Sequence, residues 1–130
     1  MSELKKKILL VDDSDLQLAI ADNILKNEYE VITAQSGEDA LKYLIKGLIP
    51  DIILLDVLMP NMDGWETYHK IRGISLLINT PIAFFTSLNE SENIKYAQGI
   101  GAAGYITKPF EKDELLEKIK DIIEKAQVKK

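Results

Sequence analysis

Cysteine is absent from this sequence, and histidine and tryptophan each occur only once. The absence of cysteine excludes disulfide bonds, thiolate metal sites and a cysteine nucleophile. With a single histidine, a metal site in this chain would have to be built mainly from oxygen ligands. These absences leave the carboxylates as the groups on which reactive chemistry would depend.

Long apolar runs and an excess of positive charge are also missing. The longest apolar runs have the length of short strands, far below a membrane span, and the start of the chain has no apolar signal segment. The 130 residues carry 16 Lys and Arg against 21 Asp and Glu, a net charge of -5, which disfavours nucleic-acid binding. We therefore expect a cytoplasmic protein without a membrane or nucleic-acid partner, folded as one domain over 1–130 with a core over about 7–125.

Five short apolar runs recur along the chain, and each is followed by turn residues and then by a helical pattern. The runs are 8–11, 31–34, 52–55, 82–85 and 105–107. Alternation of apolar strands with helices predicts an α/β fold, in which a five-stranded parallel sheet has helices on both faces. Five helices are expected, one after each strand.

Capping residues and apolar spacing predict how these helices begin, end and pack. Ser14 or Asp15 is expected to cap the first helix, Ser36 to start the second, and Gly99 to end the fourth. The predicted buried residues are Leu16, Ala19, Ile20 and Ile24 in the first helix, Leu41, Leu44 and Ile45 in the second, and Leu115, Leu116, Ile119, Ile122 and Ile123 in the last. The apolar stretch 74–78 either extends the third helix or covers the core.

Polar side chains lie at the carboxyl ends of four of the five predicted strands. Asp12 and Asp13 follow the first strand, Asp56 the third, Thr86 the fourth and Lys108 the fifth. In open α/β sheets, ligands bind at this edge, near the point where the strand order changes direction. We therefore expect these five residues to form one functional site.

The charges of this cluster require a positive charge beyond that of Lys108. Two carboxylates about 5 Å apart repel by roughly 3 kcal/mol at an effective dielectric constant of about 20, and three would cost on the order of 10 kcal/mol. Oxygen ligands without histidine or cysteine favour Mg²⁺, and such a site with a lysine and a hydroxyl group suits phosphoryl transfer. The chain has no glycine-rich nucleotide loop, so the remaining candidate is a carboxylate that accepts the phosphoryl group.

Four motifs carry a resemblance to a known family. They are Ile8 to Ser14 with Asp12-Asp13, Asp51 to Asp56 followed by Met59-Pro60 and Met62-Asp63-Gly64, Phe85-Thr86-Ser87, and Gly104 to Phe110 with Lys108-Pro109. In this order, from Lys7 to Lys125, the chain resembles the response-regulator receiver domains of two-component signalling, of the chemotaxis type. The resemblance implies a flavodoxin-like doubly wound sheet with strand order 2-1-3-4-5, and no output domain within 1–130.

The resemblance also implies a role for each site residue. Asp56 would accept a phosphoryl group from a phosphohistidine of a sensor histidine kinase or a histidine phosphotransferase. Asp13, Asp56 and the backbone carbonyl of Leu58 would bind Mg²⁺, and Asp12 would assist through bound water. Lys108 would pair with the acceptor carboxylate and then with the phosphoryl group. Such a protein is a phosphoacceptor that assists its own phosphorylation and dephosphorylation, and not a conventional enzyme.

Thr86 and Tyr105 match the switch residues of this family. Thr86 would donate its hydroxyl to the phosphoryl group and move toward it, and Tyr105 would rotate inward into the space left behind. The outer face of the fourth helix, fifth strand and fifth helix would then bind a downstream protein partner. The Lys108-Pro109 peptide bond matches one that is usually cis in the family.

Leu58 and Leu88 occupy two positions that vary within the family and set the lifetime of the phosphoryl group. Neither apolar side chain can orient an attacking water, so we expect slow to moderate self-dephosphorylation. Three nearby residues have structural interpretations: Asp63 begins a helix, Trp65 packs against the core and His69 lies on a solvated helix face.

Other functions remain open at this stage. Phosphatases with an aspartyl nucleophile also use Mg²⁺, a threonine and a lysine, but they need an acid where this chain has Leu58. Alternatively, the chain is a receiver-like interaction module that is not phosphorylated, or an N-terminal receiver trimmed from a DNA-binding regulator. The complete set of five polar residues at the strand ends favours a working receiver.

Overall fold

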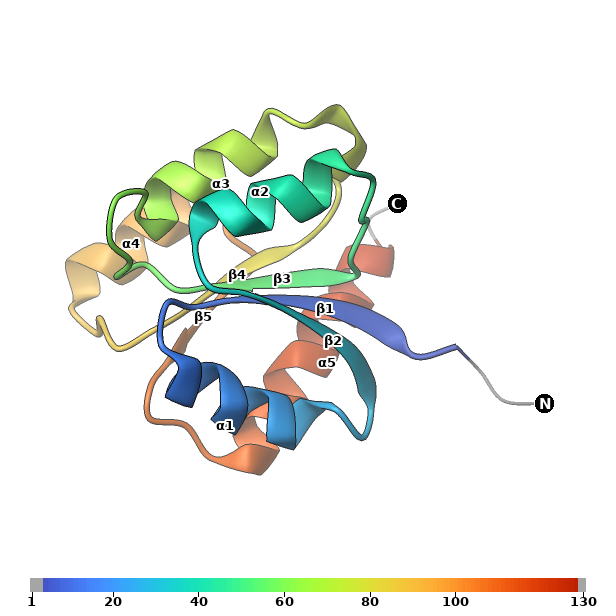
Figure 1. The fold of residues 1–130 in the computed structure, drawn as a ribbon. Helices are drawn as coiled ribbons and strands as arrows, with labels where there is room; N and C mark the ends of the chain where they lie inside the picture. Colours follow the sequence, from blue (N-terminus) through green and yellow to red (C-terminus); the bar gives the residue numbers. More distant parts are fainter. Residues whose placement is uncertain (1–3, 129–130) are drawn as a thin grey trace.

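The computed structural model describes residues 4–128 and contains a five-stranded parallel sheet between two layers of helices (Figure 1). The strands are β1 (Lys6–Val11), β2 (Tyr29–Ala34), β3 (Ile52–Leu55), β4 (Ile82–Thr86) and β5 (Gly104–Thr107). Their order is β2-β1-β3-β4-β5, and each neighbouring pair is parallel. The predicted flavodoxin-like, doubly wound sheet is confirmed.

Helices cover both faces of this sheet. They are α1 (Asp15–Leu25), α2 (Gly37–Ile45), α3 (Gly64–Arg72), α4 (Ser91–Gly99) and α5 (Lys112–Val128), with a short 3-10 helix, η1 (Ser75–Leu77). Helices α1 and α5 lie on one face, and α2, α3 and α4 lie on the other (Figure 1). Within residues 4–128, no helix combines the length and the apolar content that a membrane crossing requires.

The central strands are buried on both faces, which explains their continuous apolar sequence. Leu9 and Val11 of β1 pack into the cluster under α2, α3 and α4, whereas Ile8 and Leu10 pack under α1 and α5. A shift of one residue would move every side chain of the strand to the opposite face. The apolar runs therefore fix the register that brings the strand ends to a common edge.

Side-chain caps begin three of the helices, as predicted. Ser14, Ser36 and Asp63 each accept a hydrogen bond from the backbone N–H three residues further on, at 3.2, 3.0 and 2.9 Å. The cap of α4 differs, because Glu90 makes no side-chain hydrogen bond there. The start of α4 is therefore less firmly held than the starts of α1, α2 and α3.

The predicted buried face of α1 is wrong. Leu16 is 67% exposed, Ala19 and Ile20 are also exposed, and Ile24 is only partly buried. The side chains that are buried instead are Leu18, Ala21 and Leu25. Apolar residues occupy two overlapping stripes of this helix, so their spacing fits either face and only the packing against the sheet decides between them.

The predicted face of α2 is partly wrong, and that of α5 is confirmed. In α2 the buried stripe is Gly37, Ala40 and Leu44, with Leu41 half-buried, whereas Ile45 lies one position off this stripe and is exposed. The residues that α5 buries are Leu115, Ile119, Ile122 and Ile123, with Leu116 half-buried. The apolar pattern of α5 repeats over four turns, so it identifies the buried face without ambiguity. The nine residues of α2 are too few for the pattern to do so.

The end of α4 and the 74–78 stretch also differ from expectation. Gly99 is the last residue of α4, Ile100 is its C-cap, and the positive φ of +92° falls at Gly101. Because glycine adopts this conformation without a steric penalty, Gly101 is the residue that turns the chain toward β5. The 74–78 stretch contains η1, which buries Leu77 and leaves Leu76 exposed.

Candidate functional site

The sheet itself holds the backbone of the site residues. The N–H of Asp12 donates to the carbonyl of Ala34 at 3.1 Å, and that of Asp56 donates to the last residue of β1 at 2.9 Å. The N–H of Lys108 donates to the carbonyl of Thr86 at 2.9 Å. These bonds continue the pairing of the strands by one residue, so the side chains start from fixed positions at the carboxyl edge.

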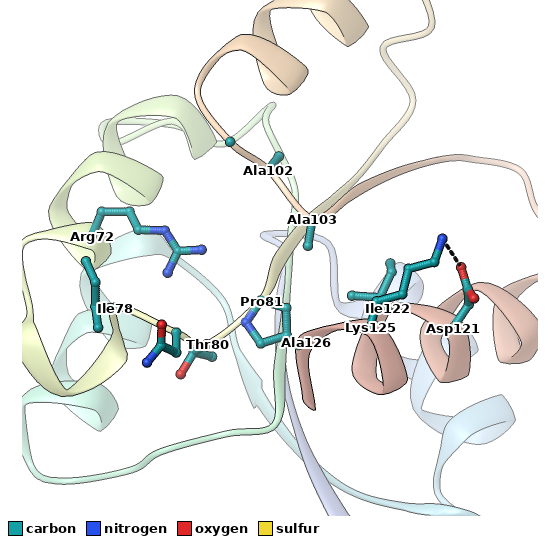
Figure 2. A pocket seen from close by; sticks show the side chains of 12 residues that line it. Arg72, Ile78, Thr80, Pro81, Ala102, Ala103, Asp121, Ile122, Lys125 and Ala126 are labelled. Atoms are coloured by element: carbon teal, nitrogen blue, oxygen red, sulfur yellow. Dashed lines mark ion pairs between the residues drawn. The ribbon is translucent and has the colours of Figure 1, made fainter. Parts of the chain in front are cut away.

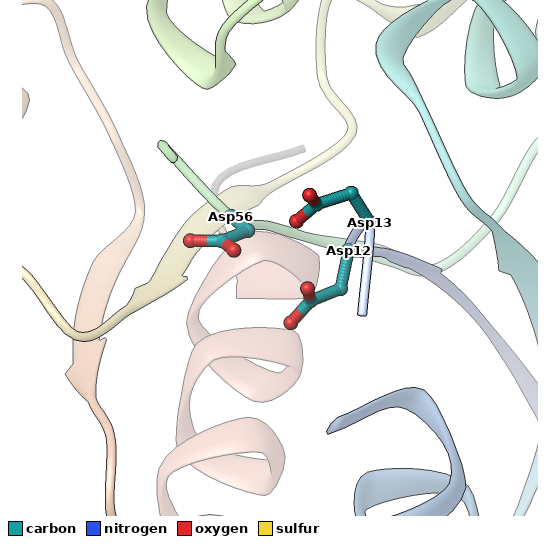
Figure 3. Close-up of side chains that lie close together, drawn as sticks. All are labelled: Asp12, Asp13 and Asp56. Carbon is teal, nitrogen blue, oxygen red and sulfur yellow. The ribbon is translucent and has the colours of Figure 1, made fainter. Parts of the chain in front are cut away.

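Three carboxylates converge at this edge. One oxygen each of Asp12, Asp13 and Asp56 lies within 4.8 Å of the others (Figure 3). Asp12 and Asp56 are only 1% and 5% exposed, whereas Asp13 is exposed. Clustered carboxylate oxygens are the donor set that Mg²⁺ prefers, and their mutual repulsion is relieved by a divalent cation. The residues present therefore fit the predicted metal.

Lys108 lies between two of these carboxylates. Its Nζ forms an ion pair with Asp12 and a second, longer one with Oδ2 of Asp56 at 3.5 Å. The same Nζ lies 5.0 Å from the centre of the Phe85 ring, a cation–π contact that helps to hold it in place. The Lys108-Pro109 peptide bond is cis, as predicted. Sequence reasoning paired Lys108 with Asp56 alone and missed its pairing with Asp12.

The environment of Asp56 makes its carboxylate more basic than usual. Burial raises the pKa of Asp56, Lys108 opposes this effect, and the neighbouring charge of Asp12 raises the pKa further. Hydrogen bonds from the Thr86 hydroxyl and the Leu58 N–H also lower the pKa, but they do not cancel the effect of burial. This raised pKa belongs to the metal-free protein, because a cation bound beside Asp56 would favour the ionised carboxylate, which is the nucleophilic form.

Thr86 and Tyr105 are joined through the backbone of Leu88. The Thr86 hydroxyl oxygen accepts a hydrogen bond from the Leu88 N–H at 3.4 Å, and the Tyr105 hydroxyl donates to the Leu88 carbonyl at 2.7 Å. Thr86 is buried and Tyr105 is half-buried. Burial, together with Glu90 and Asp56, raises the pKa of Tyr105, so its hydroxyl stays protonated and able to donate. Nothing in the sequence pattern predicted this shared partner.

Gly64 is a site residue whose role sequence reasoning missed. A Cβ at this position would lie 2.2 Å from the carbonyl oxygen of Asp56 and 2.7 Å from the Cα of Val57. The Gly64 N–H also donates to the Val57 carbonyl at 2.9 Å. The start of α3 therefore rests directly on the backbone of Asp56. The Met62-Asp63-Gly64 motif was the available signal, and it had been interpreted as a turn and helix start within the family resemblance, without a contact to Asp56.

Leu58, Leu88 and Trp65 border the site on the side of α3 and α4. They line a groove of about 500 Å³, and Leu58 is half-exposed. Trp65 packs as predicted, because its ring centre lies 4.6 Å from that of Phe84. His69 is exposed on α3, as predicted, and its Nε2 also lies 3.3 Å from the hydroxyl of a tyrosine on α4.

The carboxyl edge of this parallel sheet combines three carboxylates, a lysine and a buried threonine. Comparison with known proteins shows which class of domain has this combination. The model of the response regulator receiver domain family matches residues 8–120. The chain belongs to this family. Receiver domains bind Mg²⁺ at an acidic cluster and serve as phosphoacceptors in two-component signalling, so their interaction partners are histidine kinases or phosphotransferases.

Individual relatives agree with this assignment. The chain is 35% identical to the chemotaxis protein CheY of Halobacterium salinarum, over 92% of this chain and 98% of that protein. It is also 35% identical to the alkaline phosphatase synthesis transcriptional regulatory protein PhoP of Bacillus subtilis, over 96% of this chain but only 51% of PhoP. The crystallised chemotaxis protein CheY4 of Vibrio cholerae superimposes with a TM-score of 0.85, at 34% identity, over 91% of this chain and 98% of CheY4.

Proposed function

We propose that this chain is the phosphoacceptor of a two-component phosphorelay and that Asp56 receives the phosphoryl group. The observation that carries the proposal is the convergence of three carboxylates with Lys108 around the buried Asp56. A carboxylate oxygen of Asp56 attacks the phosphorus of a phosphohistidine. The phosphorus–nitrogen bond breaks, and its electron pair remains on the imidazole of the donor.

The other site residues bind and stabilise the transferred group. Asp12, Asp13, Asp56 and the carbonyl of Leu58 would hold Mg²⁺, which supplies positive charge next to the phosphoryl oxygens when it is bound. Lys108 turns from Asp12 toward a phosphoryl oxygen, because that oxygen carries more negative charge. The two close ion pairs of Lys108 support this exchange of partner.

For the response to phosphorylation, we propose that Thr86 and Tyr105 act together through Leu88. When the Thr86 hydroxyl moves to a phosphoryl oxygen, it gives up the hydrogen bond from the Leu88 N–H, and Tyr105 holds the other side of the same residue. The loop that leads into α4 then changes its position. A downstream protein partner binds the face formed by α4, β5 and α5 in the phosphorylated form.

The surroundings of the site support a protein donor of the phosphoryl group. A groove of about 470 Å³ opens from the carboxylates and is bordered by Ile20, Ile24 and Phe110. Apolar side chains next to the reacting groups suit the docking of a helix that carries the phosphohistidine of a sensor kinase or a phosphotransferase. This also gives a role to the outward-facing apolar stripe of α1.

Intact-protein mass after incubation with acetyl phosphate tests the proposal. We expect the wild-type protein to gain one phosphoryl group in the presence of Mg²⁺ and none after chelation, and Asp56→Asn to gain none. Asp63→Asn is the matched control, because asparagine also caps a helix and this variant should be phosphorylated normally. Phosphorylation of Asp56→Asn, or none in the wild type with either acetyl phosphate or a phosphorylated kinase, would contradict the proposal and favour a receiver-like interaction module.

A further inference from the structure

Helix α4 is anchored to the rest of the molecule more weakly than its neighbour α3. Both helices have nine residues, but α3 buries four of them, whereas α4 buries only Ala97. The residue that caps α4, Glu90, forms no side-chain hydrogen bond there. An element with few buried side chains and an open first turn changes its position at a low cost in free energy.

The carboxyl-terminal end of α4 is nevertheless held by a buried tyrosine of α3. Tyr68 is 2% exposed, and its hydroxyl donates to the carbonyl of Ile100, the C-cap of α4, at 3.0 Å. Arg72 secures this tyrosine, because its Nε donates to the Tyr68 hydroxyl at 3.4 Å and its Nη1 donates to the carbonyl of Leu77 at 2.9 Å. Figure 2 shows Arg72 in the lining of a cavity of about 340 Å³, together with Ala102, which follows α4. This end of α4 is therefore a fixed point about which the helix can pivot.

The amino-terminal end of α4 is connected to the two switch side chains through Leu88. The N–H of Leu88 donates to the Thr86 hydroxyl oxygen, and its carbonyl accepts from the Tyr105 hydroxyl. Leu88 also borders, with Trp65 of α3, the groove of about 500 Å³ beside the site. A displacement of Leu88 therefore acts at the weakly held end of α4 and next to the Trp65 side chain.

An aromatic contact joins the middle of α4 to α3, and we call it the aromatic latch. The ring centres of Trp65 and Tyr96 lie 4.8 Å apart with their planes at 87°, which is the edge-to-face geometry that aromatic pairs prefer. Trp65 is itself fixed, because its ring also packs on that of the fully buried Phe84. The Tyr96 hydroxyl lies 3.3 Å from Nε2 of His69, but both groups are exposed, so water competes for this hydrogen bond. The ring contact is therefore the stronger part of the connection.

We propose that the aromatic latch holds α4 in place in the unphosphorylated protein, and that Tyr96 is the positioning residue that determines how readily α4 is released. The latch and the hydrogen bond between Thr86 and Leu88 are present in the same conformation of the molecule. When Leu88 follows Thr86, α4 pivots at its carboxyl-terminal end and the Tyr96 ring leaves Trp65. The inference rests on the proposed phosphorylation of Asp56.

The rate of phosphorylation by acetyl phosphate with Mg²⁺ tests the latch. A weaker latch increases the population of the released conformation, in which Thr86 is free to meet the phosphoryl group. Tyr96→Leu should therefore be phosphorylated about three- to tenfold faster than the wild type. Tyr96→Phe keeps the ring and loses the hydroxyl, so its rate should stay within about twofold of the wild type.

A matched tyrosine and a spectroscopic measurement make the test specific. Tyr43→Leu is the control, because Tyr43 lies on α2 and is 43% exposed, against 47% for Tyr96; its rate should equal that of the wild type. Both side chains are exposed, so the variants should fold, and thermal unfolding checks this. Nuclear Overhauser effects between the Trp65 and Tyr96 rings should be present in the metal-free wild type and lost with Mg²⁺ and beryllofluoride, a mimic of the phosphoryl group. Those between Tyr68 and Ile100 should persist, because they lie at the pivot.

Three results would overturn the latch in a wild-type protein that is phosphorylated. They are a rate for Tyr96→Leu that is equal to or below that of the wild type, an equal acceleration by Tyr43→Leu or Tyr96→Phe, and persistence of the contact between Trp65 and Tyr96 with beryllofluoride. A slower rate would place the contact in the phosphorylated conformation instead. If the wild type gained no phosphoryl group, its unchanged mass would overturn the proposed function and the latch with it, and this failure is distinct from the other three.

Discussion

Burial of the Asp56 carboxyl group makes the stability of the metal-free fold depend on pH. Its pKa is raised from the ordinary value of 3.8, first of all by burial. The folded state therefore binds this proton more tightly than the unfolded state does. As a result, ionised Asp56 destabilises the fold at any pH above its folded pKa, and the penalty disappears as the pH falls toward 3.8.

Asp56→Asn should therefore raise the melting temperature of the metal-free protein. We expect a rise of about 3–5 °C near neutral pH, which narrows as the pH falls through the folded pKa because wild-type Asp56 then becomes neutral. Thermal unfolding in the presence of a chelator, across a pH series, measures this. Asp13→Asn should give a smaller rise, since Asp13 is exposed and screened by solvent. An unchanged or lower melting temperature for Asp56→Asn would show that Lys108 compensates the buried charge.

Leu58 should slow the loss of the phosphoryl group from Asp56. Its apolar side chain cannot orient a water molecule for attack, whereas an amide can. Leu58→Asn is therefore expected to speed dephosphorylation roughly tenfold, which is less than a general base contributes, because an amide orients the water but does not take its proton. The decay of phosphorylated protein, followed by intact mass after removal of the donor, measures the rate. Leu16→Asn serves as a control on an exposed surface, and an equal rate for Leu58→Asn and wild type would refute the role of Leu58.

At the level of secondary-structure elements, α3 is tied to the site by the close approach of Gly64. Gly64→Ala places a methyl group against the backbone of Asp56, which cannot move without disturbing β3. We expect a loss of about 2–3 kcal/mol in the free energy of unfolding. Chemical denaturation measures this loss, with Gly99→Ala as the control. Gly99 has open space around it in α4, so alanine there should be neutral or stabilise by up to about 1 kcal/mol.

If Gly64→Ala proved as stable as Gly99→Ala, the contact between α3 and Asp56 would be looser than its geometry indicates. A second readout separates stability from function. Because the methyl group pushes on the backbone of Asp56, the variant should also be phosphorylated more slowly by acetyl phosphate at a temperature where it remains folded. Gly99→Ala should keep the wild-type rate.

The strands could be predicted from sequence more reliably than the helix faces, for a physical reason. A strand buried on both faces reads as an uninterrupted apolar run, and the runs that became β1 and β3 have no competing interpretation. In α1, by contrast, Leu16 and Leu18 lie on different sides, and both sides carry further apolar residues. Tertiary packing decides which side of α1 faces the sheet, and the spacing of apolar residues within one helix cannot predict this.

The site could be predicted as a set of residues but not as a set of contacts. Parallel strands end at one edge, so the convergence of Asp12, Asp56 and Lys108 followed from the parallel direction of the strands, while the strand order came from the family resemblance. The unequal burial of Asp12 and Asp13 depends on how the loop before α1 turns. The shared use of Leu88 by the two switch side chains depends on backbone geometry. The pattern of residue types therefore predicts neither the unequal burial of the two aspartates nor the hydrogen bonds to Leu88.

On the scale of the whole molecule, the acidic carboxyl edge should attract cations over a distance. Salt screens such attraction, with a screening length of about 10 Å at 0.1 M. The dissociation constant for Mg²⁺ is therefore expected to rise about threefold or more between roughly 20 and 200 mM NaCl. Amide shifts of Asp13 and Leu58 during Mg²⁺ titration measure it. A constant that does not change with salt would mean that only the three ligand carboxylates matter.

The alignment of all five helices also affects how this protein meets its partners. The helices begin at the carboxyl edge, so acidic first-turn residues such as Glu38 and Asp113 add to the negative charge of Asp12, Asp13 and Asp56 there. A body whose negative charge is concentrated at one end experiences a torque near another charged molecule and turns before contact. A basic partner surface therefore meets the end that carries Asp56 first and searches fewer orientations during diffusion.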